Sequence, residues 1–138
     1  MATDPDAGPL MFGVHELRLV AGADASEFER VVATDVLPAA AEVPGSVNRG
    51  GQSVIGSQHL VRSDDDGVYL WLVKGTRALP TDTFLVAFER MYSGQRDTLE
   101  RFAERGSARP FAVVAGYDAG PRDHLGRPEG EPTTGAFI

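Results

Sequence analysis

The stretch SQHLVRSDDDGVYLWLVKG, Ser57 to Gly75, predicts two β-strands joined by a tight turn. Apolar and β-branched residues dominate on both sides of the DDDG segment, residues 64–67, as is typical of a β-hairpin. If those four residues form the loop, the register follows by counting outward from it. The predicted cross-strand pairs are Ser63 with Val68, Arg62 with Tyr69, Val61 with Leu70, Leu60 with Trp71 and His59 with Leu72.

A strand and a helix are expected before this hairpin. The segment LMFGVHELRLV, residues 10–20, is rich in apolar and β-branched residues and predicts a strand that ends near Val20. Asp24 and Glu27 then form a capping-box-like pair, and apolar residues follow at helical spacing. Pro38 is expected to end this helix, because the residue before a proline is pushed out of helical geometry. A Pro- and Gly-rich loop then leads to the second strand, at about residues 53–63.

A second helix and a last strand are expected after the hairpin. Aromatic and aliphatic residues at helical spacing predict a helix from Thr81 to about Arg105, with Gly106 at its C-terminal cap and Gly94 as a point of interruption. The segment PFAVVAGYD, residues 110–118, predicts the last strand. We therefore expect a flexible lead over residues 1–9, one folded domain over residues 10–118, and a Pro- and Gly-rich tail over residues 119–138.

The order strand, helix, strand, strand, helix, strand predicts an α+β, ferredoxin-like fold with an antiparallel four-stranded sheet. Right-handed crossovers favour the spatial order 4-1-3-2. Two helices cover only one face of such a sheet, yet VYLWLV and FAVVA are apolar on both faces. The second face is then expected to be buried against another copy, which predicts a homodimer through the sheets.

Two pairs of segments resemble the dimeric α+β barrel superfamily: VHELRLV followed by DASEFERVV, and GVYLWLV followed by a long helix. The resemblance covers about residues 12–118, and HELRLV is also similar to the YELR start of NIPSNAP-like members. It implies two sheets that close into a barrel with the helices outside. The superfamily includes antibiotic-biosynthesis-type and quinol monooxygenases without cofactors, haem-degrading monooxygenases, isomerases, cyclases and proteins without known activity, so the fold does not fix the function.

The resemblance also bears on single residues. In the quinol monooxygenases a tryptophan on the third strand lies near the substrate, and Trp71 is similar to it in position, although LVKGTRALP separates it from the next helix. The haem-degrading members carry a histidine on the second helix. Residues 81–105 contain no histidine, which disfavours haem degradation.

The composition excludes several classes of protein. A formal net charge of −7, with Lys74 as the single lysine, disfavours nucleic acid as a partner, because such binding needs clustered positive charge. The chain has no cysteine, no signal-peptide pattern and no apolar run long enough to span a membrane, so we expect a cytoplasmic protein without a membrane partner. Three histidines without close spacing leave no metal site, and no cofactor is expected.

His15 and His59 are the candidate catalytic residues, because an imidazole titrates near neutral pH and can act as a general base. His15 lies on a predicted central strand, where the alternative is a hydrogen-bonded core histidine. His59 lies on a predicted edge strand, where the alternative is a contact with the dimer partner. His124 is expected to be a loop residue.

Trp71, Tyr69 and Arg62 are candidate substrate-binding residues, because the predicted register places them on one face of the hairpin. Two aromatic rings and a cation could hold a planar ligand by stacking, and ordinary core packing is the alternative. Arg18 is a further candidate. With Glu16 it could bind a polar ligand group or form an ion pair between subunits.

Two functions remain open at this point. The first is a small cofactor-independent enzyme, of monooxygenase, cyclase or isomerase type, that acts on an apolar, aromatic or polyketide-like molecule between sheet and helices. The second is a non-catalytic ligand-binding or assembly module, in which the same residues belong to the core and the dimer interface.

Overall fold

A computed structural model describes residues 10–42, 54–78, 80–117 and 132–134. The predicted lead over residues 1–9, most of the loop before the second strand and most of the predicted tail, His124 included, lie outside these ranges.

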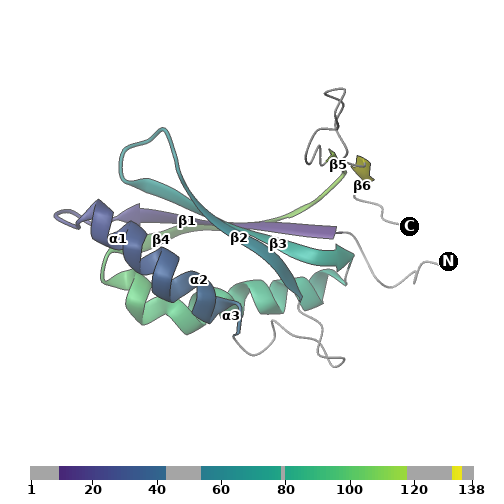
Figure 1. Ribbon diagram of the computed structural model, residues 1–138, viewed down its shortest axis with the longest axis horizontal. Helices are drawn as coiled ribbons and strands as arrows, with labels where there is room; N and C mark the ends of the chain where they lie inside the picture. The colour runs from purple at the N-terminus through teal and green to yellow at the C-terminus, as the bar shows by residue number, and fades with distance from the viewer. Residues whose placement is uncertain (1–9, 43–53, 79, 118–131, 135–138) are drawn as a thin grey trace, which may run out of the picture.

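Four antiparallel strands form the main sheet: β1 (Leu10–Leu19), β2 (Ile55–Arg62), β3 (Val68–Ala78) and β4 (Ala103–Ala112). Their spatial order is β2-β3-β1-β4, which confirms the predicted order 4-1-3-2 and the ferredoxin-like topology. Strands β1 and β3 are central, and β2 and β4 lie at the edges (Figure 1).

The β2–β3 hairpin has the predicted register. Ser63 donates its backbone N–H to the carbonyl of Val68 at 2.9 Å. Gly67 has φ 75°, which glycine adopts without strain and which closes the loop. The other predicted pairs are all present: Arg62 with Tyr69, Val61 with Leu70, Leu60 with Trp71 and His59 with Leu72.

The first helical segment starts as predicted and ends later. Asp24 caps helix α1 (Ala25–Val31) by accepting the backbone N–H of Glu27 at 3.2 Å. A π-helical turn, Val32–Val36, then leads into a short helix α2 (Leu37–Ala40). The prediction that Pro38 ends the helix is wrong, because Pro38 lies in the first turn of α2, where its missing N–H is tolerated.

The second helix, α3 (Thr81–Glu100), is shorter than predicted, and the last strand begins earlier. The chain turns at Arg101 and Phe102, and Phe102 accepts the backbone N–H of Val20 at 2.9 Å. Ala103 then pairs with Leu19 and starts β4. The predicted helical end at Arg105 and strand start at Pro110 are therefore wrong, and α3 continues through Gly94 without a break.

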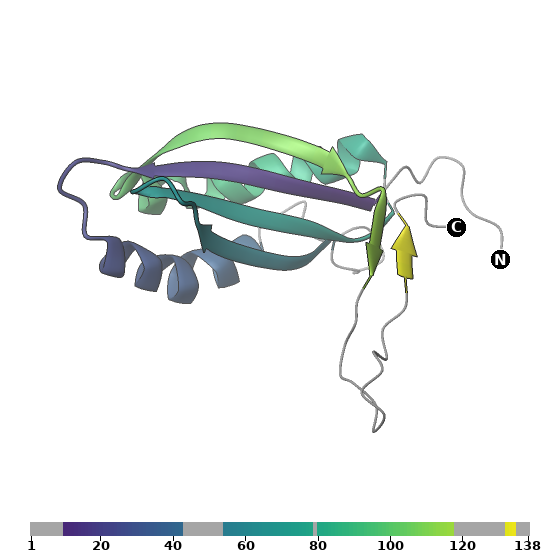
Figure 2. The same cartoon turned by 90° about the horizontal axis from the view of Figure 1, so that it is seen from above.

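Both helical layers cover the same face of the sheet, which we call the helix face (Figures 1 and 2). The core lies between this face and the helices, and its largest fully buried side chains include Trp71, Phe28, Phe84, Phe88 and Leu17. The other face, which we call the open face, carries no helix among the described residues. Strand alternation assigns to it Phe12, Val14, Glu16 and Arg18 of β1, Leu70, Leu72 and Lys74 of β3, His59 and Val61 of β2, and Arg109 and Phe111 of β4.

A second, two-stranded sheet lies beyond the end of β4. Its strands are β5 (Ala115–Tyr117) and β6 (Pro132–Thr134), and they pair antiparallel (Figure 2). Part of the predicted tail therefore contributes a strand.

Candidate functional site

His15 lies at the centre of the molecule, in a cage of aromatic rings. It projects from β1 onto the helix face and is fully buried. Its ring stacks on Phe88 of α3 at 3.9 Å between centroids, with an interplanar angle of 10°. Trp71 of β3 and Tyr92 of α3 lie at 4.9 Å and 5.8 Å from it. We call these four residues the aromatic cage.

Gly13 allows this packing. It lies two residues before His15 on the same face, and a Cβ atom there would meet the Phe88 ring at 2.3 Å. Real Cβ contacts do not occur at that distance, so a glycine is needed for α3 to approach β1 closely enough to stack on His15.

Arg105 of β4 brings a positive charge against the cage. Its Nη2 atom lies 3.3 Å from Nδ1 of His15 and accepts no bond itself, because a guanidinium only donates. The guanidinium lies 4.3 Å from the centroid of the Tyr92 ring. Both carboxylate oxygens of Glu89, on α3, accept from the same Nη2 atom at 3.0 Å.

A β-bulge in β4 turns Arg105 toward His15. His15 pairs with Ala108, but Leu17 pairs with Arg105, so two residues of β4, Gly106 and Ser107, lie opposite Glu16 alone. Without the extra residue Leu17 would pair with Gly106, and Arg105 would lie on the open face. Gly106 also leaves room for Glu16, because a Cβ there would lie 2.0 Å from its Oε1 atom.

Burial and the nearby charge keep His15 neutral. Burial lowers the pKa of His15 most, the positive charge of Arg105 lowers it further, and the backbone of Phe88 raises it by a smaller amount, so that it falls to about 3. At neutral pH the imidazole therefore carries one proton. Because Arg105 can only donate to Nδ1, that proton belongs on Nε2.

Two buried nitrogen atoms in this cluster, Nε2 of His15 and Nε of Arg105, have no hydrogen-bond partner of normal geometry among the described residues, although the backbone of Phe88 acts on the imidazole and raises its pKa. Buried donors in native proteins are nearly always paired, so unpaired ones call for an explanation. Both are donors in the assignment above. Each of them could therefore donate to an acceptor, such as a ligand oxygen, and would bind it best when it is negatively charged.

Gln58 connects the cage to the surface. It accepts the indole N–H of Trp71 at 3.1 Å and donates to the carbonyl of Leu37 at 3.0 Å, so its amide joins β3, β2 and α2. Gln58 also lines a groove of about 440 Å³ between β2 and the first helical segment. The groove residues are Glu29, Ala33 and Leu37 from the helical side and Gln58, His59, Leu60 and Arg62 from β2.

Arg62 and Tyr69 meet at Glu29 on α1, beside this groove. Arg62 donates Nε and Nη2 to the two oxygens of Glu29 at 2.9 Å and 2.8 Å, and the hydroxyl of Tyr69 donates to the same carboxylate. Hydrogen bonds from Arg62 and then from Tyr69 lower the pKa of Glu29. Burial and the neighbouring carboxylate raise the pKa of Tyr69. Glu29 thus satisfies both side chains.

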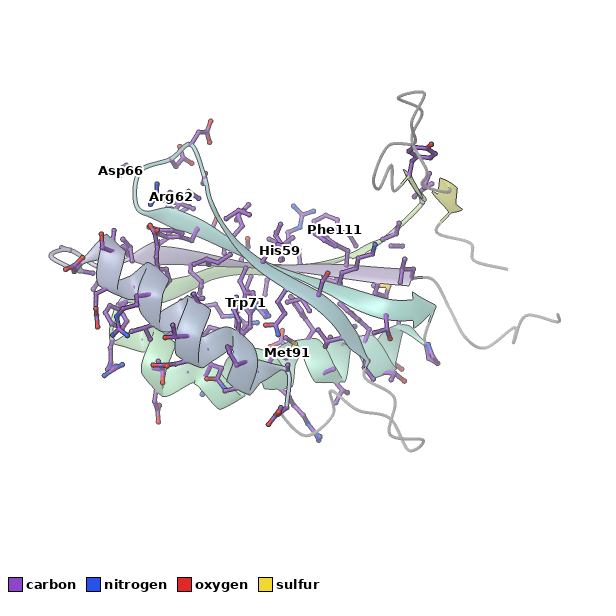
Figure 3. The ribbon with its side chains drawn as sticks, in the orientation of Figure 1. His59, Arg62, Asp66, Trp71, Met91 and Phe111 are labelled. Carbon is purple, nitrogen blue, oxygen red and sulfur yellow. The ribbon has the colours of Figure 1, made fainter. Side chains whose placement is uncertain are left out.

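The structure brings together only part of the predicted site. His15 and Trp71 share the cage, and Tyr69 and Arg62 lie farther along the helix face at Glu29. His59 is exposed on the edge strand β2, and its side chain lies on the opposite face of the sheet from Trp71 (Figure 3). Arg18 is exposed on the open face, where its Nε pairs with Glu16 of the same strand at 3.1 Å.

Sequence reasoning missed Arg105, Tyr92 and Gln58 as site residues. Tyr92 and Phe88 belong to the aromatic and aliphatic residues whose spacing predicts that helix, and they lie on it. Arg105 was assigned to the end of that helix, and no pattern in the sequence places a bulge beside it. Gln58 has one available signal, because it lies two residues from Leu60 on the face of the hairpin that carries Trp71.

No cluster of three or more potential metal-ligating side chains exists within the described ranges. In the same ranges, no helix has both the length and the apolar character that a membrane span requires.

Comparison with known proteins gives one likeness. The sequence matches no protein-family model, and a search of curated proteins finds no match. The structure is similar to the crystal structure of SnoaB, a cofactor-independent oxygenase from Streptomyces nogalater, determined for a mutant. The TM-score is 0.50 at 19% sequence identity, over 74% of this chain and 90% of SnoaB. The likeness shows the ferredoxin-like fold; it gives no support to the NIPSNAP-like resemblance.

Proposed function

We propose that the protein is a small cofactor-independent enzyme of the oxygenase type, which acts on a planar aromatic molecule with an ionisable hydroxyl group. The observation that carries this proposal is the pair of unpartnered buried N–H groups, on His15 and Arg105, inside a cage of aromatic rings. The fold shared with SnoaB, a cofactor-independent oxygenase, supports it. Cyclases and isomerases that pass through an enolate would use the same donors.

The two donors suit the chemistry of such a reaction. Without a cofactor, the substrate itself must supply the electrons that reduce O₂, and a phenolate or enolate supplies them more readily than the neutral form. Two N–H donors in a water-poor site stabilise that anion. His15 is neutral and its Nδ1 atom faces the guanidinium of Arg105, so it would act as a hydrogen-bond donor to the substrate anion through Nε2.

Trp71 and Phe88 would provide the stacking surface for the ring. Arg105 would be the substrate-binding cation in place of Arg62, since Arg62 is bound to Glu29 and Arg105 lies at His15. The groove beside Gln58 would give access, because Gln58 lines the groove and hydrogen-bonds Trp71. A ligand hydroxyl could replace both of its hydrogen bonds, by accepting from the indole and donating to Leu37.

The proposal is tested with 1,5-dihydroxynaphthalene, which gains one oxygen atom to give juglone while the second oxygen atom leaves as water. We expect O₂ uptake and juglone formation in equal amounts, in the presence of a metal chelator. Arg105→Gln should lower kcat/KM by at least about 100-fold, as is usual for the loss of one oxyanion donor. Arg101→Gln, which removes an exposed charge at the end of α3, serves as the control. Equal rates with and without the protein would contradict the proposal for this substrate class.

The second candidate function is non-catalytic binding of the same class of ligand. The complete burial of His15 and Trp71 supports the wider alternative of a non-catalytic ligand-binding or assembly module, because it is what core residues of such a module would show. Saturable binding of 1,5-dihydroxynaphthalene without O₂ uptake would support this function over the first. We also propose that two copies associate through the open face, as the apolar side chains there and the superfamily resemblance suggest.

A further inference from the structure

We propose that Glu89 is a positioning residue: it holds Arg105 against His15 and so fixes the imidazole proton on the buried Nε2 atom. The inference rests on the proposed function and deepens it. That function needs a proton on Nε2 of His15, and the inference gives the reason why the proton lies there. It rests on three contacts of one nitrogen atom, Nη2 of Arg105.

Nη2 of Arg105 has more hydrogen-bond acceptors around it than protons to donate. Nη2 carries two N–H groups, and three acceptors lie around it: Oε1 and Oε2 of Glu89 at 3.0 Å and Nδ1 of His15 at 3.3 Å. The carboxylate is the stronger acceptor, so it decides where the guanidinium sits. The imidazole receives the longer contact, and its proton is excluded from Nδ1.

Arg105 needs such an anchor, because solvent competes for it. Its side chain keeps 24% of its surface exposed, at an edge strand, and a long arginine side chain has many other conformations. Stacking over Tyr92 limits how the guanidinium tilts, at 4.3 Å from the ring centroid. Among the described residues, Glu89 gives Arg105 its hydrogen bonds to α3, the helix that also carries Phe88 and Tyr92. One helix therefore positions three of the groups around His15.

The groups that face His15 are few. Arg105 faces it from β4 and Tyr92 from α3, and Glu89 acts on it through Arg105. From β3 it meets the uncharged Trp71. Glu16, its neighbour on β1, points to the open face and pairs with Arg18 there. The backbone of Phe88 also acts on the ring and raises its pKa, so Arg105 is the charged group, among the described residues, whose placement biases the tautomer of His15.

The test measures the ring nitrogens of His15 directly, by long-range ¹H–¹⁵N correlation in the protein without substrate at neutral pH. We expect the wild type to show a protonated Nε2 and an unprotonated Nδ1. In Glu89→Ala the ratio of the two neutral tautomers should fall by roughly fivefold, as the loss of one hydrogen bond would cause. The His15 titration should also move up toward its ordinary range, because Arg105 is then free to turn into solvent.

Two further variants sharpen the result. Glu89→Gln keeps the size and one acceptor oxygen and should lie between the wild type and Glu89→Ala. Asp97→Ala removes an exposed carboxylate from the same helix and should match the wild type. A surface ion pair without a positioning role would leave the His15 tautomer and titration unchanged in Glu89→Ala, and that result would overturn the inference.

The two proposals can fail separately. If the tautomer moves in Glu89→Ala while no hydroxylated aromatic compound is turned over, the positioning role stands and the proposed function falls. If juglone forms but Glu89→Ala leaves the tautomer unchanged, the function stands and the positioning role falls.

Discussion

His15 illustrates the stability that is lost when a polar residue is buried at the centre of a small domain. The position is fully buried, and the imidazole stays there by remaining neutral, by stacking on Phe88 and by accepting from Arg105. A phenylalanine would fill the same space without an unpaired N–H group. A histidine that contributes less to stability than an apolar residue would is typical of a site kept for function.

This cost depends on pH. The unfolded chain binds a proton at His15 near its ordinary pKa of about 6.5, whereas the folded protein keeps the residue neutral down to about pH 3. Between these values the unfolded state binds more protons, so stability is complete above pH 6.5 and falls as the pH drops through this window. Between pH 8 and pH 5 the wild type should lose about 2 kcal/mol of unfolding free energy that His15→Phe keeps. Urea unfolding followed by circular dichroism at both pH values measures this; equal losses in the two proteins would contradict a neutral buried His15.

At the scale of elements, the parts predictable from the sequence are those fixed by local rules. The β2–β3 register was predictable because a four-residue loop leaves one way to count outward. The Asp24 cap was predictable because its side chain bonds three residues ahead. Strand β4 was not, because AERGSARPFA carries charges, a glycine and a proline and lacks the alternation of a half-buried strand.

The same limit explains which part of the site was predictable. His15 and Trp71 lie on central strands, where a polar or aromatic residue is visible against an aliphatic background. Arg105 depends on an edge strand and on a bulge of one extra residue, and a bulge reflects pairing between distant segments. The prediction that Pro38 ends the helix failed because the π-helical turn before it lets the chain continue as helix.

The groove between β2 and the first helical segment gives a prediction about access to the cage. Ala33, in the π-helical turn, is exposed and lines the groove, whereas Ala39, on α2, is exposed and does not line it in the part of the chain that the structure describes. Ala33→Phe should therefore weaken binding of 1,5-dihydroxynaphthalene by at least about tenfold, and Ala39→Phe should bind like the wild type. Trp71 is the only tryptophan, so its single indole N–H resonance reports binding next to Gln58. Equal affinity in both variants would mean that the ligand uses another route.

In the whole molecule, no described helix covers the open face of the sheet. A single copy leaves Phe111 41% exposed and Val61 36% exposed on this face, with Leu70, Leu72 and Val14 half-buried between them. Apolar side chains thus run across all four strands, and the Glu16–Arg18 pair interrupts them on β1. A second copy placed face to face would bury these side chains together with His59, the histidine that the aromatic cage leaves out.

Leu72 is the position that tests this arrangement, because it lies on central strand β3 between His59 and Val14 in the register of the sheet. Analytical ultracentrifugation should show a wild-type dimer and a monomeric Leu72→Glu variant, since a carboxylate buried between two sheets would lack a partner. Val86→Glu places the same charge at a side chain of α3 that is 48% exposed, away from the open face, and should remain a dimer. A monomeric wild type, or a Leu72→Glu variant that stays dimeric, would contradict association through the sheets. In a monomer the donors of His15 and Arg105 would have to act without any contribution from a second copy.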